Sequence, residues 1–221
     1  MGLFLVADGM GGHAAGEIAS QLAASSVDDW MKAHAEDHGN LADVMRLGAL
    51  KANARVFEAQ RENHALAGMG STLTALLFRG QRYYIAHAGD SRAYRLRAGD
   101  LEQLTDDHSL VWPLYKNGMM QKSELVRHPQ KNLITRSIGS HPQVEIDVLE
   151  GEGRAGDVYL LCSDGLTDAV PEERIREMLS DPQKTPDEIA DLLVAAANEE
   201  GGPDNITVVI IKLEPGEGQN R

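Results

Sequence analysis

The chain has 221 residues, 42% of them hydrophobic and 25% charged, which is typical of a folded globular domain and excludes a disordered or fibrous protein. Its 34 acidic residues outnumber 21 basic ones, for a formal charge of −13. This balance argues against a nucleic-acid partner, which clustered positive charge would attract. No apolar run approaches the ~20 residues of a membrane helix, so no membrane partner is expected. The single cysteine, Cys162, excludes an internal disulfide and favours the cytoplasm.

The N-terminal part predicts one strand followed by two long helices. Residues 3–7 form a short apolar run that ends at Asp8, and a glycine-rich turn follows at 9–12. Apolar residues then recur at helical spacing over residues 16–34. Asn40 has the side chain of a helix cap and precedes a second run with helical spacing.

The middle of the chain changes to alternation with period two, which predicts short strands. The turns between these strands are too short for crossovers and favour antiparallel hairpins. Residues 106–131 are polar and mixed, and they contain Pro113 and Pro129; we expect a short helix and then a surface excursion that selects substrates. The predicted strands are residues 72–78, 82–88, 93–97 and 101–104.

The C-terminal part predicts two strands, a helix pair and a last strand, in the order strand 144–149, strand 157–162, helix 171–180, helix 185–199 and strand 206–213. Stacked antiparallel sheets flanked by helices, an α+β architecture, fit this order best. A parallel doubly wound sheet would need helices between the strands of residues 72–104. We expect one domain over residues 1–213 and a flexible Gly- and Glu-rich tail over 214–221.

Four aspartates stand where a predicted strand meets a turn. Asp8, Asp90 and Asp164 each close an apolar run, and Asp204 opens the last strand. If these ends converge, their oxygens suit hard cations such as Mg²⁺ or Mn²⁺, whereas a zinc site is disfavoured because the chain has no cysteine cluster. Each aspartate alone is better explained as a turn or cap residue, and only the pattern of four leaves both interpretations open.

Short motifs around these aspartates follow one another along the chain. They are Val6-Ala7-Asp8-Gly9-Met10-Gly11-Gly12-His13, Gly70-Ser71-Thr72, Gly89-Asp90-Ser91-Arg92, Ser163-Asp164-Gly165-Leu166 and Asp204-Asn205-Ile206-Thr207. Together they resemble the motif series of the metal-dependent type 2C (PPM) serine/threonine protein phosphatases, in their bacterial form. Leu104-Thr105-Asp106-Asp107-His108 and Leu133-Ile134-Thr135-Arg136 also resemble that family's segments around a mobile flap.

The resemblance implies a four-layer α/β/β/α sandwich whose two central, mostly antiparallel sheets are flanked by helix pairs. It also implies two Mn²⁺ or Mg²⁺ ions, with Asp8 bridging them, the Gly9 carbonyl binding one, and Asp164 and Asp204 completing much of the site. Asp90 with Asp164 would hold a third, weaker cation. Asn205 would orient the last of these ligands.

The implied activity is hydrolysis of phosphoserine and phosphothreonine in proteins by a metal-activated water. The phosphorylated proteins would be the products of a bacterial serine/threonine kinase. His13 is the candidate general acid for the leaving alkoxide; alternatively, it packs at a helix start. His87, His108 and His128 are interpreted as structural or flap residues. Cys162, inside an apolar strand, is interpreted as a packing residue.

The family pattern also places an acidic ligand and a phosphate-binding arginine before the present Met1, and it would leave residues 3–7 with an exposed strand edge. The natural protein is therefore expected to be longer. The alternative is an N-terminally truncated, weak or inactive regulatory module that binds phosphoproteins. A phosphatase of small phosphate esters is a third possibility.

Overall fold

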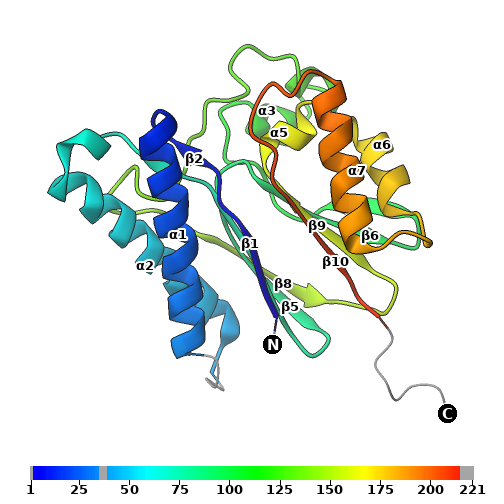
Figure 1. The fold of residues 1–221 in the computed structure, drawn as a ribbon, viewed down its shortest axis with the longest axis horizontal. Helices are drawn as coiled ribbons and strands as arrows, with labels where there is room; N and C mark the ends of the chain where they lie inside the picture. The colour runs from blue at the N-terminus through cyan, green and yellow to red at the C-terminus, as the bar shows by residue number, and fades with distance from the viewer. Residues whose placement is uncertain (1, 35–38, 215–221) are drawn as a thin grey trace.

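The computed structural model describes residues 2–34 and 39–214, with the backbone alone for His13. Two sheets lie face to face between two helix pairs (Figure 1). The first sheet has the order β1-β4-β5-β8, and every neighbouring pair in it is antiparallel. Its strands are β1 (Gly2–Val6), β4 (Leu73–Arg79), β5 (Arg82–Ala88) and β8 (Asp147–Glu152).

The second sheet is also antiparallel, with the order β10-β9-β6-β7. Aromatic and aliphatic side chains such as Leu76, Ile85 and Tyr159 are buried between the two sheets, where their removal from water stabilises the sandwich. A two-stranded sheet pairs β2 (Gly9–Met10) with β3 (Gly70–Ser71). The strands of the second sheet are β6 (Arg92–Arg97), β7 (Asp100–Gln103), β9 (Val158–Cys162) and β10 (Val208–Lys212).

One helix pair covers each sheet. Helices α1 (His13–Ala33) and α2 (Leu41–Glu62) pack on the first sheet, and η1 (His64–Leu66) follows them. The one-turn helix α5 (Asp164–Thr167), α6 (Glu172–Leu179) and α7 (Pro186–Glu199) pack on the second. The α+β fold class, an α/β/β/α sandwich of antiparallel sheets, is therefore confirmed.

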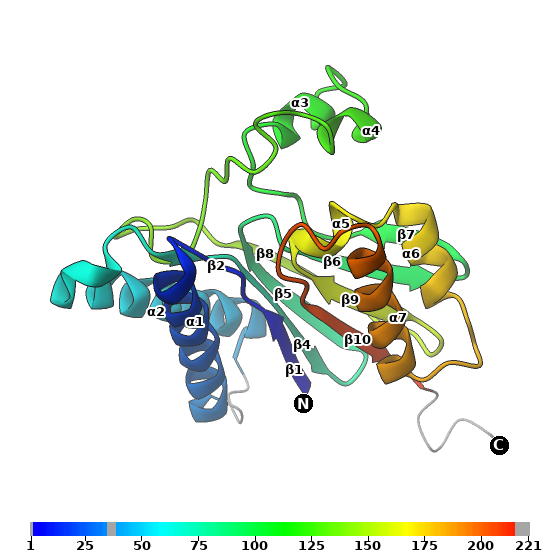
Figure 2. The ribbon, with the colours of Figure 1, turned by 45° about the horizontal axis from the view of Figure 1, so that its top comes forward.

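The polar middle segment projects away from the sandwich. Figure 2 shows α3 (Trp112–Lys116) and α4 (Lys122–Leu125) lying above the sheets at the end of two extended connections. We call residues 110–133 the flap. A bridge between Ser109 and Ile134 closes its base, and the Leu110 amide donates to the Leu133 carbonyl at 2.9 Å.

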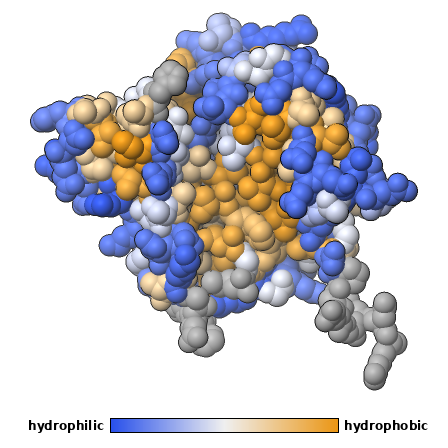
Figure 3. Space-filling view, viewed as in Figure 1, coloured by the Kyte–Doolittle hydropathy of each residue, from blue (hydrophilic) through white to orange (hydrophobic). Residues whose placement is uncertain are grey.

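Strands β1 and β10 lie at the edges of their sheets among the described strands, which confirms the exposed edge expected for residues 3–7. Figure 3 shows apolar surface across the middle of the face that carries both strands. Phe4 and Val209 are half-buried there against the core between the sheets.

Two predicted strand starts were wrong for the same reason. β8 begins at Asp147 rather than at 144, because its first partner, His87, is next to the end of β5. β10 begins at Val208 rather than at 206, because it pairs from Cys162, the end of β9. Asp204 therefore lies in the loop before the strand. Of the predicted flexible tail, residues 215–221 lie outside the described residues.

None of the described helices is long and apolar enough to cross a lipid bilayer.

Candidate metal centre

Asp8 is held by its backbone against the start of β4. Its amide donates to Thr72 Oγ1 at 2.9 Å, and its carbonyl accepts from the Thr72 amide at 2.8 Å and from Ser71 Oγ at 3.1 Å. Three hydrogen bonds around one residue leave its backbone little freedom. The half-buried carboxylate of Asp8 is therefore presented from a fixed point.

Gly9 follows Asp8 and touches the first turns of α1. A Cβ on Gly9 would lie 1.9 Å from the Gly16 carbonyl oxygen, and a Cβ on Gly16 would lie 2.8 Å from the Gly9 carbonyl oxygen. Only glycine at both positions permits this approach. The close contact explains why a glycine-rich turn follows Asp8.

Asp90 lies in the turn between β5 and β6, directly after Gly89. Gly89 has a φ of 119°, and a Cβ there would lie 2.6 Å from the Thr72 Cβ. Thr72 Oγ1 is also 2.7 Å from Ser91 Oγ. Thr72 thus contacts the turns of both Asp8 and Asp90, although the two aspartates are far apart in sequence.

Thr72→Val should lower the free energy of unfolding of the metal-free protein by about 1 to 3 kcal/mol. Valine keeps the shape of threonine but leaves the Asp8 amide without an acceptor and Ser91 without its partner. Urea denaturation measures the change, and Thr72→Ser, which retains the hydroxyl, should recover most of it. Equal stability of Thr72→Val and wild type would contradict this account of the two turns.

Asp164 opens helix α5, and the loop that carries Asp204 packs against it. A Cβ on Gly165 would lie 2.3 Å from the Asn205 carbonyl oxygen. Ser163 Oγ donates to that carbonyl at 3.2 Å and accepts from the Thr207 amide at 3.0 Å. Ser163 and Gly165 thereby fix the Asp204 loop beside Asp164, even though Asp204 itself is exposed.

The carboxylates interact electrostatically. Burial and the charge of Asp204 raise the pKa of Asp8. Burial, together with the charges of Asp168, Asp8 and Asp204, raises the pKa of Asp164 to about 6. Burial and the charge of Asp164 raise the pKa of Asp90 to about 8. Each carboxyl group is thus costly to ionise without a neighbouring positive charge.

One oxygen of this cluster has no protein partner. Asp164 Oδ1 is buried and accepts no hydrogen bond, which is costly for a carboxylate unless a ligand satisfies it. Within the described part of the chain, no three acidic, histidine or cysteine side chains stand close enough together to hold an ion as they are. The oxygen-only donors and the orphaned Oδ1 fit a hard divalent cation.

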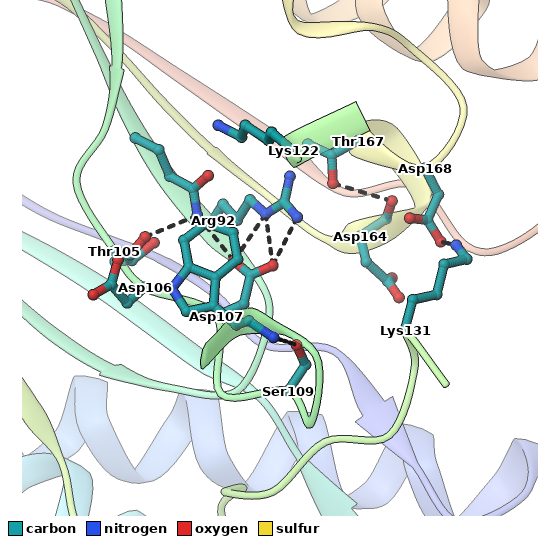
Figure 4. A network of polar contacts seen from close by, with 12 residues as sticks. Arg92, Thr105, Asp106, Asp107, Ser109, Lys122, Lys131, Asp164, Thr167 and Asp168 are labelled. Carbon is teal, nitrogen blue, oxygen red and sulfur yellow. Dashed lines mark hydrogen bonds and ion pairs between the residues drawn. The ribbon is translucent and has the colours of Figure 1, made fainter. Parts of the chain in front are cut away.

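A groove of about 350 Å³ opens beside Asp90 and Asp164. The flap supplies one wall, and α5 with the start of α6 supplies the other. Figure 4 shows Lys131 of the flap turned toward Asp168 beside Asp164, with Lys122 nearby. The groove is lined on the flap side by Leu125, Arg127 and Lys131, and on the opposite side by Asp164, Asp168 and Glu172.

Two ion pairs join the walls of this groove. Lys131 pairs with Asp168, and Lys122 Nζ lies 2.7 Å from Glu172 Oε1. The charge of Lys131 also opposes the rise in the pKa of Asp164. The sequence did not predict a role for either lysine, because a single lysine in a polar segment indicates no function until its acidic partner is known.

An ion pair between Arg92 and Asp107 also lines the groove. Arg92 donates to both carboxylate oxygens of Asp107, with distances of 2.7 to 3.1 Å, and its guanidinium lies 5.8 Å from the ring of Trp112. Figure 4 shows Arg92 and Asp107 facing each other. This paired, packed arginine secures the strand that begins next to Asp90.

The structure thus brings the predicted aspartates into one neighbourhood, in which Asp164 interacts with Asp8, Asp90 and Asp204. Gly9 lies next to this group because it directly follows Asp8 in the chain. The backbone of His13 begins α1 just after the glycine turn; its side chain, and with it the general-acid prediction, lies outside the described residues. His87 and Cys162 are buried, and burial raises the pKa of the Cys162 thiol to about 12, which fits a packing role.

Comparison with known proteins gives consistent matches. Residues 2–206 match the family model described as Protein phosphatase 2C. Serine/threonine protein phosphatase PstP of Mycobacterium tuberculosis is 45% identical over 211 residues, covering 94% of this chain and 40% of PstP. Serine/threonine phosphatase stp of Listeria monocytogenes is 38% identical over 214 residues, covering 96% of this chain and 84% of stp. The chain thus spans less than half the length of the mycobacterial relative.

Solved structures agree. The crystal structure of M. tuberculosis PstP/Ppp superposes with a TM-score of 0.87 at 44% identity, covering 96% of this chain and 88% of that one. The catalytic domain of PstP in complex with two manganese ions gives a TM-score of 0.86 at 40% identity, with coverages of 96% and 88%. The alternative of a truncated, inactive regulatory module finds no support in these comparisons.

Proposed function

Because this chain belongs to the protein phosphatase 2C family, we propose that it hydrolyses phosphoserine and phosphothreonine in proteins with the help of Mn²⁺ or Mg²⁺. The observation that carries the proposal is the meeting of Asp90 and Asp164, both with raised pKa values, at a groove where Asp164 Oδ1 lacks a partner. Residues 1–213 would form the phosphatase domain.

Asp8, Asp164, Asp204 and the Gly9 carbonyl would hold two cations, and Asp90 with Asp164 would hold a third. Bound cations supply two things to phosphoryl transfer: they lower the pKa of an attacking water, and they neutralise the charge of the phosphoryl oxygens. The family match and the cluster of carboxylates beside Asp164 support this assignment. Asn205, whose backbone N–H donates to Asp204 Oδ1 at 2.7 Å, would orient Asp204.

The protein's own residues would position the ester and manage its proton. The water oxygen bonds to phosphorus, the bond from phosphorus to the seryl or threonyl oxygen breaks, and that oxygen takes a proton. His13, at the start of α1 beside the Asp8 turn, would donate this proton. The groove would orient the substrate and limit its access to other water.

Phosphorylated proteins, the products of a serine/threonine kinase, are the proposed substrates. The names of the relatives, which are serine/threonine protein phosphatases, support protein substrates over small esters. Lysine and arginine side chains from the flap line the groove, although the chain as a whole is strongly acidic. The groove is also lined by acidic residues, and Lys122 and Lys131 are paired with Glu172 and Asp168, so bound cations would be needed to attract the phosphate group.

Release of inorganic phosphate from phosphothreonine, phosphoserine and phosphotyrosine peptides and from glucose 6-phosphate tests the proposal. We expect turnover of the first two substrates with Mn²⁺, loss of turnover with chelator, and recovery when Mn²⁺ is returned. Comparable turnover of the sugar phosphate would favour the small-ester alternative. Phosphopeptide binding without turnover would favour a regulatory module.

A further inference from the structure

The groove beside Asp90 and Asp164 is larger than a phosphate group needs. Its volume of about 350 Å³ is within the range of pockets that enclose a whole small ligand. A phosphorylated side chain whose phosphate lies at Asp164 would therefore leave part of the groove to the neighbouring residues of the substrate. The side chains that line this part decide which neighbours fit.

Apolar residues line the groove from both walls. On the flap, two of them lie in sequence between Lys122 and Lys131, and on the opposite wall three lie between Asp168 and Glu172. Each lysine forms an ion pair with one of these acidic residues across the groove. The apolar stretches of the two walls are thus held next to each other. We call these five residues the apolar slot: Leu125, Val126, Ala169, Val170 and Pro171.

The apolar slot has a packed base and an accessible rim. Leu125 is buried against Trp112 in the flap, and Val170 is 1% exposed in the core between the second sheet and its helices. Val126, by contrast, is 44% exposed, and Pro171 is also exposed. A ligand can therefore reach apolar surface that is backed by two packed clusters.

The charges beside the apolar slot are already balanced. Besides the two lysine pairs, Arg92 pairs with Asp107. A charged substrate side chain in the slot would have to break one of these pairs or stay unpaired, and either costs free energy. Arg127 and Glu173 also line the groove, but both are exposed and their charges are of opposite sign. An apolar side chain is therefore the occupant that fits the slot.

We propose that the apolar slot binds an apolar side chain next to the phosphorylated residue, so that the protein prefers phosphoserine and phosphothreonine with a neighbour such as leucine. The proposal rests on the function proposed above, which places the phosphate at Asp164. Binding removes apolar surface of both partners from water. Because the slot does not touch the bonds that change, it stabilises substrate and transition state alike, which lowers KM and leaves kcat unchanged.

Steady-state hydrolysis of phosphothreonine peptides with Mn²⁺ measures this preference. Each peptide has glycine on both sides of the phosphothreonine. One position at a time, from two residues before it to two residues after it, is replaced by leucine, glutamate or lysine. We expect leucine to lower KM about tenfold at one or more of these positions, with kcat unchanged. Neither charged residue should match this effect.

Three variants test the walls of the slot. Val126→Arg replaces an exposed residue, so the core stays intact, and its guanidinium should cancel the advantage of leucine and make glutamate the preferred neighbour. Pro171→Ser removes apolar surface from the opposite wall and supplies a preferred capping residue for α6, so it should weaken the leucine preference without unfolding the protein. Leu192→Arg is the matched control, because Leu192 is an exposed apolar residue on α7 that does not line the groove.

A leucine preference that survives in Val126→Arg, or equal KM values for all peptides in the wild type, would overturn the apolar slot. Calorimetric binding of the same peptides to the wild type with Mn²⁺ separates this result from failure of the proposed function. Hydrolysis without a leucine preference would remove the slot and leave the function standing. Tighter binding of leucine peptides without hydrolysis would contradict the function and leave the slot in place, and binding with neither would contradict both.

Discussion

Asp164→Asn is expected to reduce Mn²⁺-dependent phosphopeptide hydrolysis by at least about a thousandfold while making the metal-free protein more stable. The two effects have one cause. The carboxylate of Asp164 interacts with four other acidic groups, and its Oδ1 is buried without a partner. Such a carboxylate favours the binding of a cation and destabilises the metal-free protein.

The stability gain follows from the raised pKa. A carboxyl group whose pKa is about 6 in the folded protein, against an ordinary value of 3.8, costs free energy of folding at neutral pH. Asparagine removes that cost, which we put on the order of 1 to 3 kcal/mol. Thermal unfolding in chelator and phosphate release in Mn²⁺ measure the two effects.

Asp191→Asn is the matched control, because Asp191 is an exposed carboxylate on α7. It should change neither stability nor activity. A metal-free Asp164→Asn protein that is less stable than wild type would show that the carboxylate has a structural partner. Retained activity would remove Asp164 from the site.

Asp90→Asn should stabilise the metal-free protein increasingly as the pH rises. The pKa of Asp90 is raised from 3.8 to about 8 in the folded state, so the folded state holds a proton that the unfolded state releases. Near pH 4 the wild type therefore keeps its full stability relative to Asp90→Asn. As the pH rises toward 8, the wild type becomes progressively less stable than the variant. Above pH 8 the difference should level off, on the order of 2 to 4 kcal/mol.

Only the difference between the two proteins isolates Asp90. Other groups titrate with the opposite sign: burial lowers the pKa of His87 to about 3, which destabilises the fold as the pH falls below the unfolded value. Denaturation of both proteins in chelator from pH 4 to 9 gives the difference. A constant gap between wild type and Asp90→Asn over this range would contradict a raised pKa at Asp90.

Local signals in the sequence account for most of the fold. The Asn40 cap was predicted from its side chain, and Asn40 Oδ1 accepts from the Ala42 amide at 3.1 Å. The predicted hairpin of residues 72–88 is β4 and β5, joined by a tight turn at Gly80. Periodicity and turn residues suffice for elements of this kind, because their neighbours in space are their neighbours in sequence.

Elements whose partners are far away in the sequence were not predicted, or were predicted with the wrong first residue. The pair of β2 and β3 joins Gly9 to Ser71, and two-residue strands have no periodicity to detect. The one-turn helix α5 after Asp164 is too short for a pattern and follows from packing against the Asp204 loop.

The candidate site shows the same division. The aspartates were found because each lies near the end of an apolar strand or in a known motif. The residues that hold them in place, such as Thr72 and Ser163, stood in the motifs, but the sequence indicated no role for them. Their hydrogen bonds to Asp8 and to the Asp204 loop span 64 and 42 residues. His108 stood in a segment that resembles the flap motif, but its two hydrogen bonds with the backbone of Gly89 are visible only in the three-dimensional structure.

Anomalous diffraction from crystals of the protein grown with Mn²⁺ tests the central claim most directly, because it locates the cations independently of any assay. The account predicts two strong manganese peaks among Asp8, the Gly9 carbonyl, Asp164 and Asp204, and a weaker one between Asp90 and Asp164. Peaks elsewhere, or no peak within bonding distance of Asp164 Oδ1 at saturating Mn²⁺, would contradict it.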